Sequence, residues 1–379
     1  MYLQNGGFIM AKCIKRAGII FFAIFVSCLL ALGCAFTTNV MSTNNDSISL
    51  SGDEIVDNND DDIVYDFELS GNCSQIATTW KSAIEKSLTT KANVKVKLVS
   101  NWLATINEDK TTAFGTGVGF SDKGAISVPS GADITINLNG KNIFRQLSQQ
   151  TIMPGGNVID VAGTLTINDS SYNSEAIKKI YDACKENRDV LIANFQNLAI
   201  GKIGAGSNLG DNGGGIYVAE GAVLNFNGGM ICDNYFKNIN STTMGGAGIY
   251  CLKSTVNMND GIIFNNKTNR ERGAGVAVNK GTFNMNGGYV VKNDSVEEWA
   301  GGIYCIGEYD NTIENEADRI IHSYINITKG IISHNYGTCG SGVTYARYGK
   351  GSINNAELTY NCSVANSSAL LVWDYTSEV

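Results

Sequence analysis

The sequence predicts an all-β protein: a right-handed parallel β-helix with three-strand coils, a base period of 27, an N-terminal capping helix and one inserted helix. Three observations predict this fold. A two-part repeat recurs along the second half of the chain, short β-branched runs are interrupted by Gly and Asn, and 379 residues include 43 Gly but only 2 Pro. Pro is expected to be scarce because it removes a donor from the ladder of a sheet.

The repeat has a glycine module and an asparagine-closed block. The glycine modules begin at Gly215, Gly248, Gly275, Gly302 and Gly342, so successive start positions differ by 33, 27, 27 and 40. The blocks start with an apolar residue, keep another in sixth place and end on Asn; they span 226–234, 258–266, 285–293, 327–335 and 353–361. The base period is therefore 27, and the two longer spacings exceed it by 6 and 13, which indicates insertions in two coils.

The residue types favour one repeat architecture. Helical repeats need apolar residues three and four positions apart, and leucine-rich repeats need Leu-x-x-Leu-x-Leu; neither pattern recurs here. A propeller blade needs about 40 residues, more than the base period. Three short strands with tight Gly and Asn turns fit a repeat of this length, which indicates a parallel β-helix.

Equivalent residues of successive coils should lie above one another, about 4.8 Å apart. Two apolar columns are expected inside the coils, formed by Ile216, Ile249, Val276, Ile303 and Val343, and by Phe226, Met258, Met285, Ile327 and Ile353. The Asn residues that close the blocks should form a structural ladder of side-chain amides: Asn234, Asn266, Asn293, Asn335 and Asn361. Asn also tolerates the left-handed backbone that a corner needs.

The repeat extends toward the N-terminus in degenerate form, at 126–139 and 158–168, so one β-helix domain is expected over 77–379. At the start of this region, Ile76, Trp80, Ile84 and Leu88 form a helical stripe, and Val94–Val99 switches to the period of a strand.

A helical insertion is expected at 174–198, because Ile177, Ile180, Tyr181 and Cys184 keep helical spacing behind Asn173. Its role is either packing against the solenoid or binding. At the other end, 368–373 begins another coil, so the C-terminal end is expected to be uncapped.

Residues 1–35 have the pattern of a signal peptide: Lys12, Lys15 and Arg16 precede the apolar run 17–32, and small residues follow. Translation from Met10 is an alternative start, and an uncleaved membrane anchor is an alternative to cleavage. Residues 31–34 also resemble a bacterial lipobox, so lipidation of Cys34 is a further alternative. Residues 36–76, rich in Asn, Ser and Asp, are expected to form a polar, acidic linker.

Two groups of proteins resemble this sequence. The glycine module followed by an Asn-closed block is similar to the repeats of chlamydial polymorphic outer membrane proteins, although their Phe-x-x-Asn spacing is not kept cleanly. The helix with Trp80, the strand at 94–102, the segment 134–140 and the Gly-Gly-Gly-Ile-Tyr coils more closely resemble secreted right-handed β-helix repeat proteins of Gram-positive bacteria. This resemblance covers about residues 77–373. It implies the pectin-lyase-like fold, a cell-surface location and, often, adhesion or glycan contact.

Composition and motifs argue against several classes of partner, cofactor and catalytic site. A net charge of −8 and a pI of about 4.9 argue against a nucleic-acid partner. No metal or cofactor site is expected, and the only histidines, His322 and His334, are expected on turns without a catalytic role. Arg270, Glu271 and Arg272 are expected to form a solvated loop tip. Asp233, Asp260 and Glu357 fall in different columns, so no catalytic pair of carboxylates is expected.

The cysteines do not indicate a disulfide framework. Seven lie beyond Cys34, and Cys251 and Cys305 share a column but are two coils apart, about 9.6 Å, which is too far for a bond. Buried thiols are expected instead.

The expected function is therefore non-catalytic: a secreted or bacterial cell-surface β-helix that binds an extracellular glycan or a host or cell-surface protein. The insertions at 174–198 and 306–318 are the expected contact sites. Membrane contact would occur only through the signal or a lipid anchor. Two alternatives remain: a polysaccharide lyase or glycoside hydrolase of the same fold, and a structural stalk.

Overall fold

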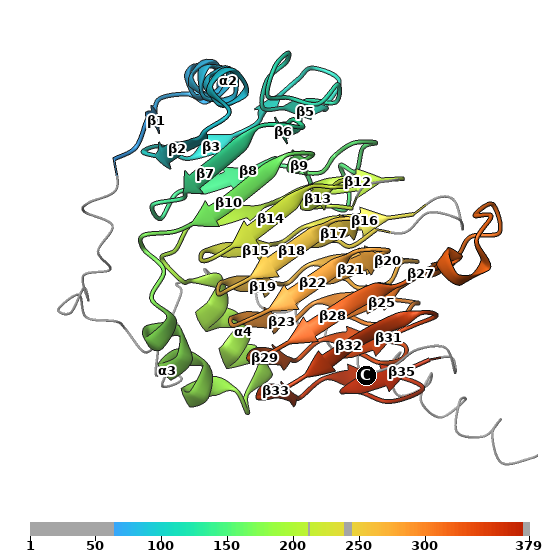
Figure 1. Ribbon diagram of the computed structural model, residues 1–379. Helices are drawn as coiled ribbons and strands as arrows, with labels where there is room; N and C mark the ends of the chain where they lie inside the picture. The colour runs from blue at the N-terminus through green and yellow to red at the C-terminus, as the bar shows by residue number, and fades with distance from the viewer. Residues whose placement is uncertain (1–63, 211–212, 239–244, 374–379) are drawn as a thin grey trace, which may run out of the picture. The chain divides into compact units, whose positions relative to one another are not determined.

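Short parallel strands make up most of the structure, a computed structural model that describes residues 64–210, 213–238 and 245–373. They lie in four long parallel sheets that the chain visits in a recurring order (Figure 1). We number the sheets 1 to 4 in that order and call one passage through them a circuit. The class is therefore all-β with few helices, compatible with a parallel β-helix.

The repeat strands of sheet 1 begin directly after the glycine that opens each module, and those of sheet 2 contain the apolar starts of the blocks. Sheet 1 contains β6 (Ile126–Val128), β9 (Ile159–Val161), β13 (Ile216–Val218), β17 (Ile249–Leu252), β21 (Val276–Asn279), β25 (Ile303–Ile306), β31 (Val343–Tyr345) and β35 (Leu370–Val372). Sheet 2 contains β1 (Phe67–Leu69), β2 (Asn93–Leu98), β7 (Asp133–Asn137), β10 (Thr164–Asn168), β14 (Val223–Phe226), β18 (Thr255–Met258), β22 (Thr282–Met285), β28 (Ser323–Ile327) and β32 (Gly349–Ile353).

The other two sheets flank the Asn that closes each block. Sheet 3 contains β3 (Trp102–Leu103), β8 (Asn142–Phe144), β11 (Lys202–Gly204), β15 (Met230–Cys232), β19 (Ile262–Phe264), β23 (Tyr289–Val291), β29 (Gly330–Ser333) and β33 (Ala356–Thr359). Sheet 4 contains β12 (Ser207–Leu209), β16 (Tyr235–Lys237), β20 (Lys267–Asn269), β24 (Asp294–Val296), β30 (Tyr336–Gly337) and β34 (Cys362–Ser363).

A complete circuit therefore has four strands, not the three that the sequence predicted. The missed strands are those of sheet 4, which are two or three residues long and carry polar sequences such as Lys267–Asn269. Strands this short do not complete the alternation of apolar and polar residues by which a strand is recognised. They exist because their backbone groups pair with the equivalent strands of neighbouring circuits.

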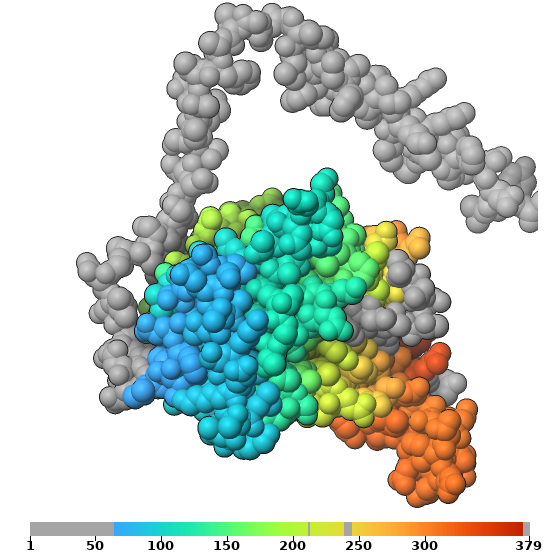
Figure 2. Space-filling model, turned by 90° about the horizontal axis from the view of Figure 1, so that it is seen from above, coloured from blue at the N-terminus to red at the C-terminus, as the bar shows by residue number. Residues whose placement is uncertain are grey.

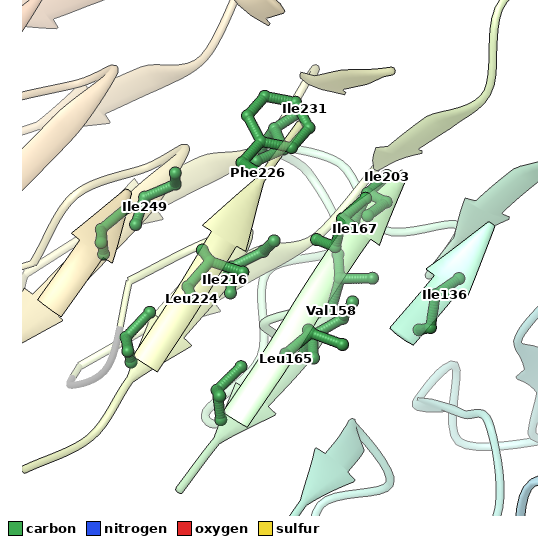
Figure 3. Packing of buried hydrophobic residues seen from close by; sticks show 14 of the residues in the cluster. Ile136, Val158, Leu165, Ile167, Ile203, Ile216, Leu224, Phe226, Ile231 and Ile249 are labelled. Atoms are coloured by element: carbon green, nitrogen blue, oxygen red, sulfur yellow. The ribbon is translucent and has the colours of Figure 1, made fainter. Parts of the chain in front are cut away.

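The register of the sheets aligns the predicted apolar columns. In sheet 1, Ile216 pairs with Ile249, Ile249 with Val276, Val276 with Ile303, and Ile303 with Val343. In sheet 2, the column from Phe226 to Ile353 aligns in the same way. All of these side chains except Ile353 are fully buried, and Figure 3 shows several of them from neighbouring strands pointing into one interior. Each fully buried aliphatic side chain stabilises the fold by about 1.5–3 kcal/mol.

The folded region starts earlier than the predicted boundary at residue 76. Strand β1 pairs in parallel with β2, and α2 (Cys73–Thr90) connects them. Asn72 begins the helix by accepting a hydrogen bond from Gln75 N, and Ile76, Trp80 and Ile84 are buried. The three residues of β1 were too few to stand out from the polar linker.

Two helices occupy 174–198, where one was predicted. Helix α3 (Ser174–Cys184) buries the four residues of the predicted stripe, and α4 (Arg188–Gln196) begins after a break at which Asn187 accepts a bond from Val190 N. Both helices pack on the outer side of sheet 3 (Figure 1). Phe195 lies 5.8 Å from Phe264, and Tyr181 lies 5.7 Å from Tyr289, between ring centres. Strands β15, β19 and β23 of sheet 3 are therefore buried on both sides, which explains their continuous apolar runs.

Two antiparallel hairpins depart from the parallel sheets. One pairs β4 (Thr105–Ile106) with β5 (Thr112–Ala113). The other pairs β26 (Glu308–Tyr309) with β27 (Ile320–Ile321) and includes the short 3₁₀ helix η1 (Glu316–Asp318). Figure 2 shows this second segment, in orange, projecting from the surface. It contains most of the predicted insertion 306–318, which therefore has a place on the surface where a partner could reach it.

Candidate functional site

The five block-closing asparagines lie in successive circuits at the corner between sheets 3 and 4. The side-chain amide of Asn234 donates to Asn266 Oδ1 at 2.9 Å, and the bonds from Asn266, Asn293 and Asn335 to the next Asn are each 3.0 Å. The backbone N–H of each of these four also donates to the same oxygen. Four are fully buried, whereas Asn361 is half-buried.

The left-handed backbone at this corner falls one residue earlier than predicted. Positive φ angles occur at Asp233, Asn265, Lys292, His334 and Tyr360, each directly before a ladder asparagine. The ladder residue itself is selected by its amide, which both donates and accepts along the column. The residue before it adopts the left-handed conformation, which is strained for most of the residue types found there. The pairing of the strands on both sides imposes this conformation.

Two further ladders run along the outer side of sheet 2, and sequence reasoning missed them. One joins Asn225, Asn257, Asn284 and Asn326 through amide bonds of 2.9–3.0 Å. The other joins Asn227, Asn259 and Asn286 and ends on Thr328. The signal was present in the alternation Asn-x-Asn of 225–227, 257–259 and 284–286. These ladders leave a row of half-exposed amides at the surface.

One end of this row borders a groove beside helix α3. Ser174 and Lys178 of α3 line the groove, together with Asn259, Asp260 and Asn286. The turns between sheets 2 and 3 contribute Gly287, Gly288 and Lys329, and β33 contributes Glu357. The cavity volume is about 280 Å³. We call it the α3 groove.

The α3 groove contains two carboxyl groups that the sequence had placed in unrelated columns. Tyr172 donates its hydroxyl to Asp260 Oδ1 at 2.7 Å, and Gly261 N donates to the same atom at 2.9 Å. Tyr181 OH lies 3.4 Å from Glu357 Oε1, and Lys185 Nζ lies 3.8 Å from it. Burial, reinforced at Tyr172 by the Asp260 charge, raises the pKa of both phenols. The phenols therefore stay protonated and hold the two carboxylates in place.

A second groove, of about 390 Å³, follows the corner between sheets 3 and 4. Its lining includes Asp233, Asn265, Lys267 and Asp294, and also the segment 147–150. Asn265 donates to Asp233 at 2.6 Å, and Lys292 forms an ion pair with Asp294. Two of the lining side chains therefore bond to each other, and the charge of a third, Asp294, is paired with a lysine outside the lining.

The segment Arg270–Glu271–Arg272 is not the solvated loop tip that was predicted. Only Arg270 is exposed there. Glu271 is 6% exposed and accepts a hydrogen bond from Asn238, and burial raises its pKa to about 7. Arg272 lies over the rings of Trp299 and Tyr304 at 5.2 and 5.7 Å and pairs with Glu298. The apolar and aromatic surroundings come from other circuits, so local charge did not reveal them.

Neither groove has a histidine or cysteine among its lining residues. His322 Nδ1 contacts Tyr348 O, and His334 is nearly buried, stacked on Tyr360, with its pKa lowered mainly by burial. The seven cysteines in the described part of the chain are free. Burial raises the pKa of Cys251 to about 11 and that of Cys305 further, so these thiols remain protonated and unreactive.

The hairpin that contains most of the insertion 306–318 carries an exposed aromatic and aliphatic surface. Tyr309 and Ile320 are 39% and 40% exposed, and nearby Tyr324 is 38% exposed. The Tyr309 ring lies 6.4 Å from that of Tyr348, and His322 lies 6.1 Å from Tyr324. Half-exposed tyrosines of this kind combine an apolar ring with a polar tip, as interfaces require.

The predicted signal peptide at 1–35, the lipidation candidate Cys34 and all of the linker up to residue 63 lie outside the described residues. Within 64–210, 213–238 and 245–373, no helix has the length and apolar character needed to cross a membrane. The same ranges contain no cluster of three His, Cys, Asp or Glu side chains that could hold a metal ion.

Comparison with protein-family models, with curated proteins and with solved structures found no significant match. The class of protein is thus defined by the fold alone: an all-β chain of stacked parallel sheets.

Proposed function

We propose that this chain is a secreted or cell-surface β-helix protein that binds an extracellular glycan or a host or cell-surface protein without catalysis. In this proposal the helix is right-handed, its base period is 27, α2 caps its N-terminal end, and its relatives are secreted repeat proteins of Gram-positive bacteria. The pairings of Ile249 with Val276 and of Val276 with Ile303 support the period. The observation that supports binding is the α3 groove, because it offers both hydrogen-bond donors and hydrogen-bond acceptors at the surface.

Binding rather than catalysis is favoured by the separation of the backbone positions from which Asp260 and Glu357 extend. Glu357 aligns with Ile331, Tyr289 and Ile262, so it lies three strands from Ile262, which follows Asp260 by two residues. At about 4.8 Å per strand, the backbones of Glu357 and Ile262 are about 14 Å apart. Catalytic carboxylates of glycoside hydrolases are about 5–9.5 Å apart. In this chain, the hydrogen bonds of Asp260 to Tyr172 and of Glu357 to Tyr181 oppose a movement that would bring the two carboxylates closer.

The test is retention of the folded, full chain on a glycan array and on host or bacterial cells. We expect saturable retention that disappears when the protein is denatured. Binding to neither surface, by a protein shown to be folded by circular dichroism, would contradict the proposal and leave the structural stalk as the better account.

A carbohydrate-active enzyme is the second candidate, because Asp260 and Glu357 do line one groove. It predicts that the protein releases reducing ends or unsaturated products from acidic polysaccharides. It also predicts that Asp260→Asn and Glu357→Gln each abolish this release. The first candidate predicts no release by the native protein, so a single assay series separates the two.

A further inference from the structure

Several polar groups of the α3 groove have hydrogen-bond donors or acceptors that are available to a ligand. Both hydrogen bonds to Asp260 fall on Oδ1, and the contacts of Glu357 with Tyr181, Thr359 and Lys185 fall on Oε1. The second oxygen of each carboxylate is thus available to accept a bond from a ligand. Asn259 and Asn286 each use their amide for one ladder bond, which leaves a second N–H.

The charges of the groove cancel. Lys178 and Lys329 carry two positive charges, and Asp260 and Glu357 carry two negative ones. Lys178 is also paired with Asp182 at 2.5 Å. An anionic ligand would meet two carboxylates and a cationic ligand two ammonium groups. A neutral molecule with many hydroxyl groups fits this balance, because a hydroxyl both donates and accepts.

Two of the residues that line the groove, Gly287 and Gly288, are packed too closely for a side chain. Gly288 has φ of +82°, and a Cβ there would lie 2.5 Å from Gly261 O and 2.7 Å from Met258 Cε. A Cβ on Gly287 would lie 2.5 Å from Asn259 O. Positions 287 and 288 therefore accept only glycine. The volume of about 280 Å³ is at the lower limit for small-ligand sites, which suits one or two sugar rings.

We propose that the α3 groove is the binding site for a neutral saccharide of one or two rings, or for such a unit within a longer glycan. This inference rests on the proposed glycan-binding function and adds its location and ligand class. Asp260, Glu357, Asn259 and Asn286 bond to the sugar hydroxyls, and α3 forms the wall beside the sugar.

A bulky side chain on the α3 wall tests the site without disturbing the core. Ser174 is exposed and lines the groove, whereas Glu175 is exposed, adjacent and not part of the lining. The probes are glucose, lactose, cellobiose, N,N′-diacetylchitobiose and digalacturonic acid, added to the folded full chain and followed by saturation-transfer NMR and calorimetry. We expect at least one neutral sugar to bind, Ser174→Trp to weaken it by about tenfold or more, and Glu175→Trp to leave it unchanged.

The ligand class has its own test. Binding of a neutral sugar should not change between low and high salt, because no net charge is neutralised. Exclusive binding of digalacturonic acid, or no binding of any probe, overturns the inference. If the glycan array shows retention and Ser174→Trp does not change it, the site assignment fails while the proposed function stands. If the native chain is retained by no glycan, the proposed glycan-binding function fails as well.

Discussion

Arg145 shows how one buried side chain can organise a region of many loops. Its guanidinium is fully buried and donates to the backbone oxygens of Gly155 and Thr112 at 2.7 and 3.0 Å, and to those of Asn157 and Lys123. Burial lowers its pKa to about 10, which still leaves it charged at neutral pH. The cost of burying the charge is offset by these bonds, and the nearby Asp160 charge favours the same ionised state.

Replacement of this arginine should be strongly destabilising. Arg145→Met keeps most of the side-chain volume but leaves several buried carbonyl groups without a donor, so we expect a loss of about 3–5 kcal/mol in the free energy of unfolding. Arg270→Met, at an exposed arginine, should change it by less than about 0.5 kcal/mol. Urea denaturation of both variants measures the difference, and equal effects would contradict this role for Arg145.

Glu271 should make stability depend on pH. Its carboxyl pKa rises from 4.5 in the unfolded chain to about 7 in the folded one, because burial disfavours the charge. Between these values unfolding releases a proton, so the stabilising contribution is complete below pH 4.5 and is lost as the pH rises through 7. The full contribution corresponds to about 3 kcal/mol.

Glu271→Gln mimics the protonated state, so it should match the native protein at pH 4 and exceed its stability by up to about 3 kcal/mol at pH 8. Glu297→Gln, at an exposed position, is the control and should leave the pH profile unchanged. Chemical denaturation from pH 4 to 8 measures both profiles. A Glu271→Gln profile parallel to that of the native protein would show that this carboxyl does not titrate differently in the two states.

At the scale of elements, successive circuits are joined in two ways. The strands join them through backbone hydrogen bonds, and the amide ladders add hydrogen bonds between side chains. Asn293 accepts from the backbone and side-chain amides of Asn266 and donates to Ile263 O and Asn335 Oδ1. Each bond inside the ladder lies where water cannot replace it. A break in the middle therefore leaves donors and acceptors unsatisfied on both sides.

We expect Asn293→Ala to lower the free energy of unfolding by about 3–5 kcal/mol, because several buried groups lose their partner. Asn361→Ala should cost about 1 kcal/mol, since Asn361 is half-buried and solvent can reach its neighbours. Guanidinium denaturation of the two variants tests this gradient. If both changes cost the same, burial does not determine the strength of the ladder.

The helices α3 and α4 depend on aromatic contacts with sheet 3. Phe195→Ala should cost about 3–5 kcal/mol, because a fully buried ring between Tyr181, Phe264 and Tyr289 is removed. Hydrogen exchange should then accelerate in α3 and α4 before it does in the sheets. Val190→Ala, on the exposed side of α4, should have little effect. Uniform acceleration over the whole chain would contradict separate docking of these helices.

At the scale of the whole molecule, the net negative charge leads us to expect no binding to nucleic acids. The chain carries 36 acidic and 28 basic residues, and three of the basic ones lie in the predicted signal peptide. We expect no retention on DNA-cellulose at about 0.15 M salt, because nucleic-acid binding depends on the release of phosphate counterions by clustered cations. Salt-sensitive retention of the mature chain would show that a basic face exists despite the net charge.

The sequence predicted the parallel strands, the aligned apolar columns and the helical stripe of α3, because these follow from local spacing and from the identity of equivalent residues. It did not predict the strands of sheet 4, which are too short to show a pattern, or the early start at β1. It missed the α3 groove because Asp260 and Glu357 appear unrelated until the register brings both beside one helix.

By itself the sequence determined which residues repeat and therefore which ones stack, since a recurring spacing places equivalent side chains above each other. Only the tertiary structure decided which surfaces those stacks create. Tyr181 contacts Glu357 although the two are far apart along the chain, and Glu271 is buried by side chains from other circuits. Contacts of this kind depend on how inserted helices and loops pack on the sheets, and no local pattern encodes that packing.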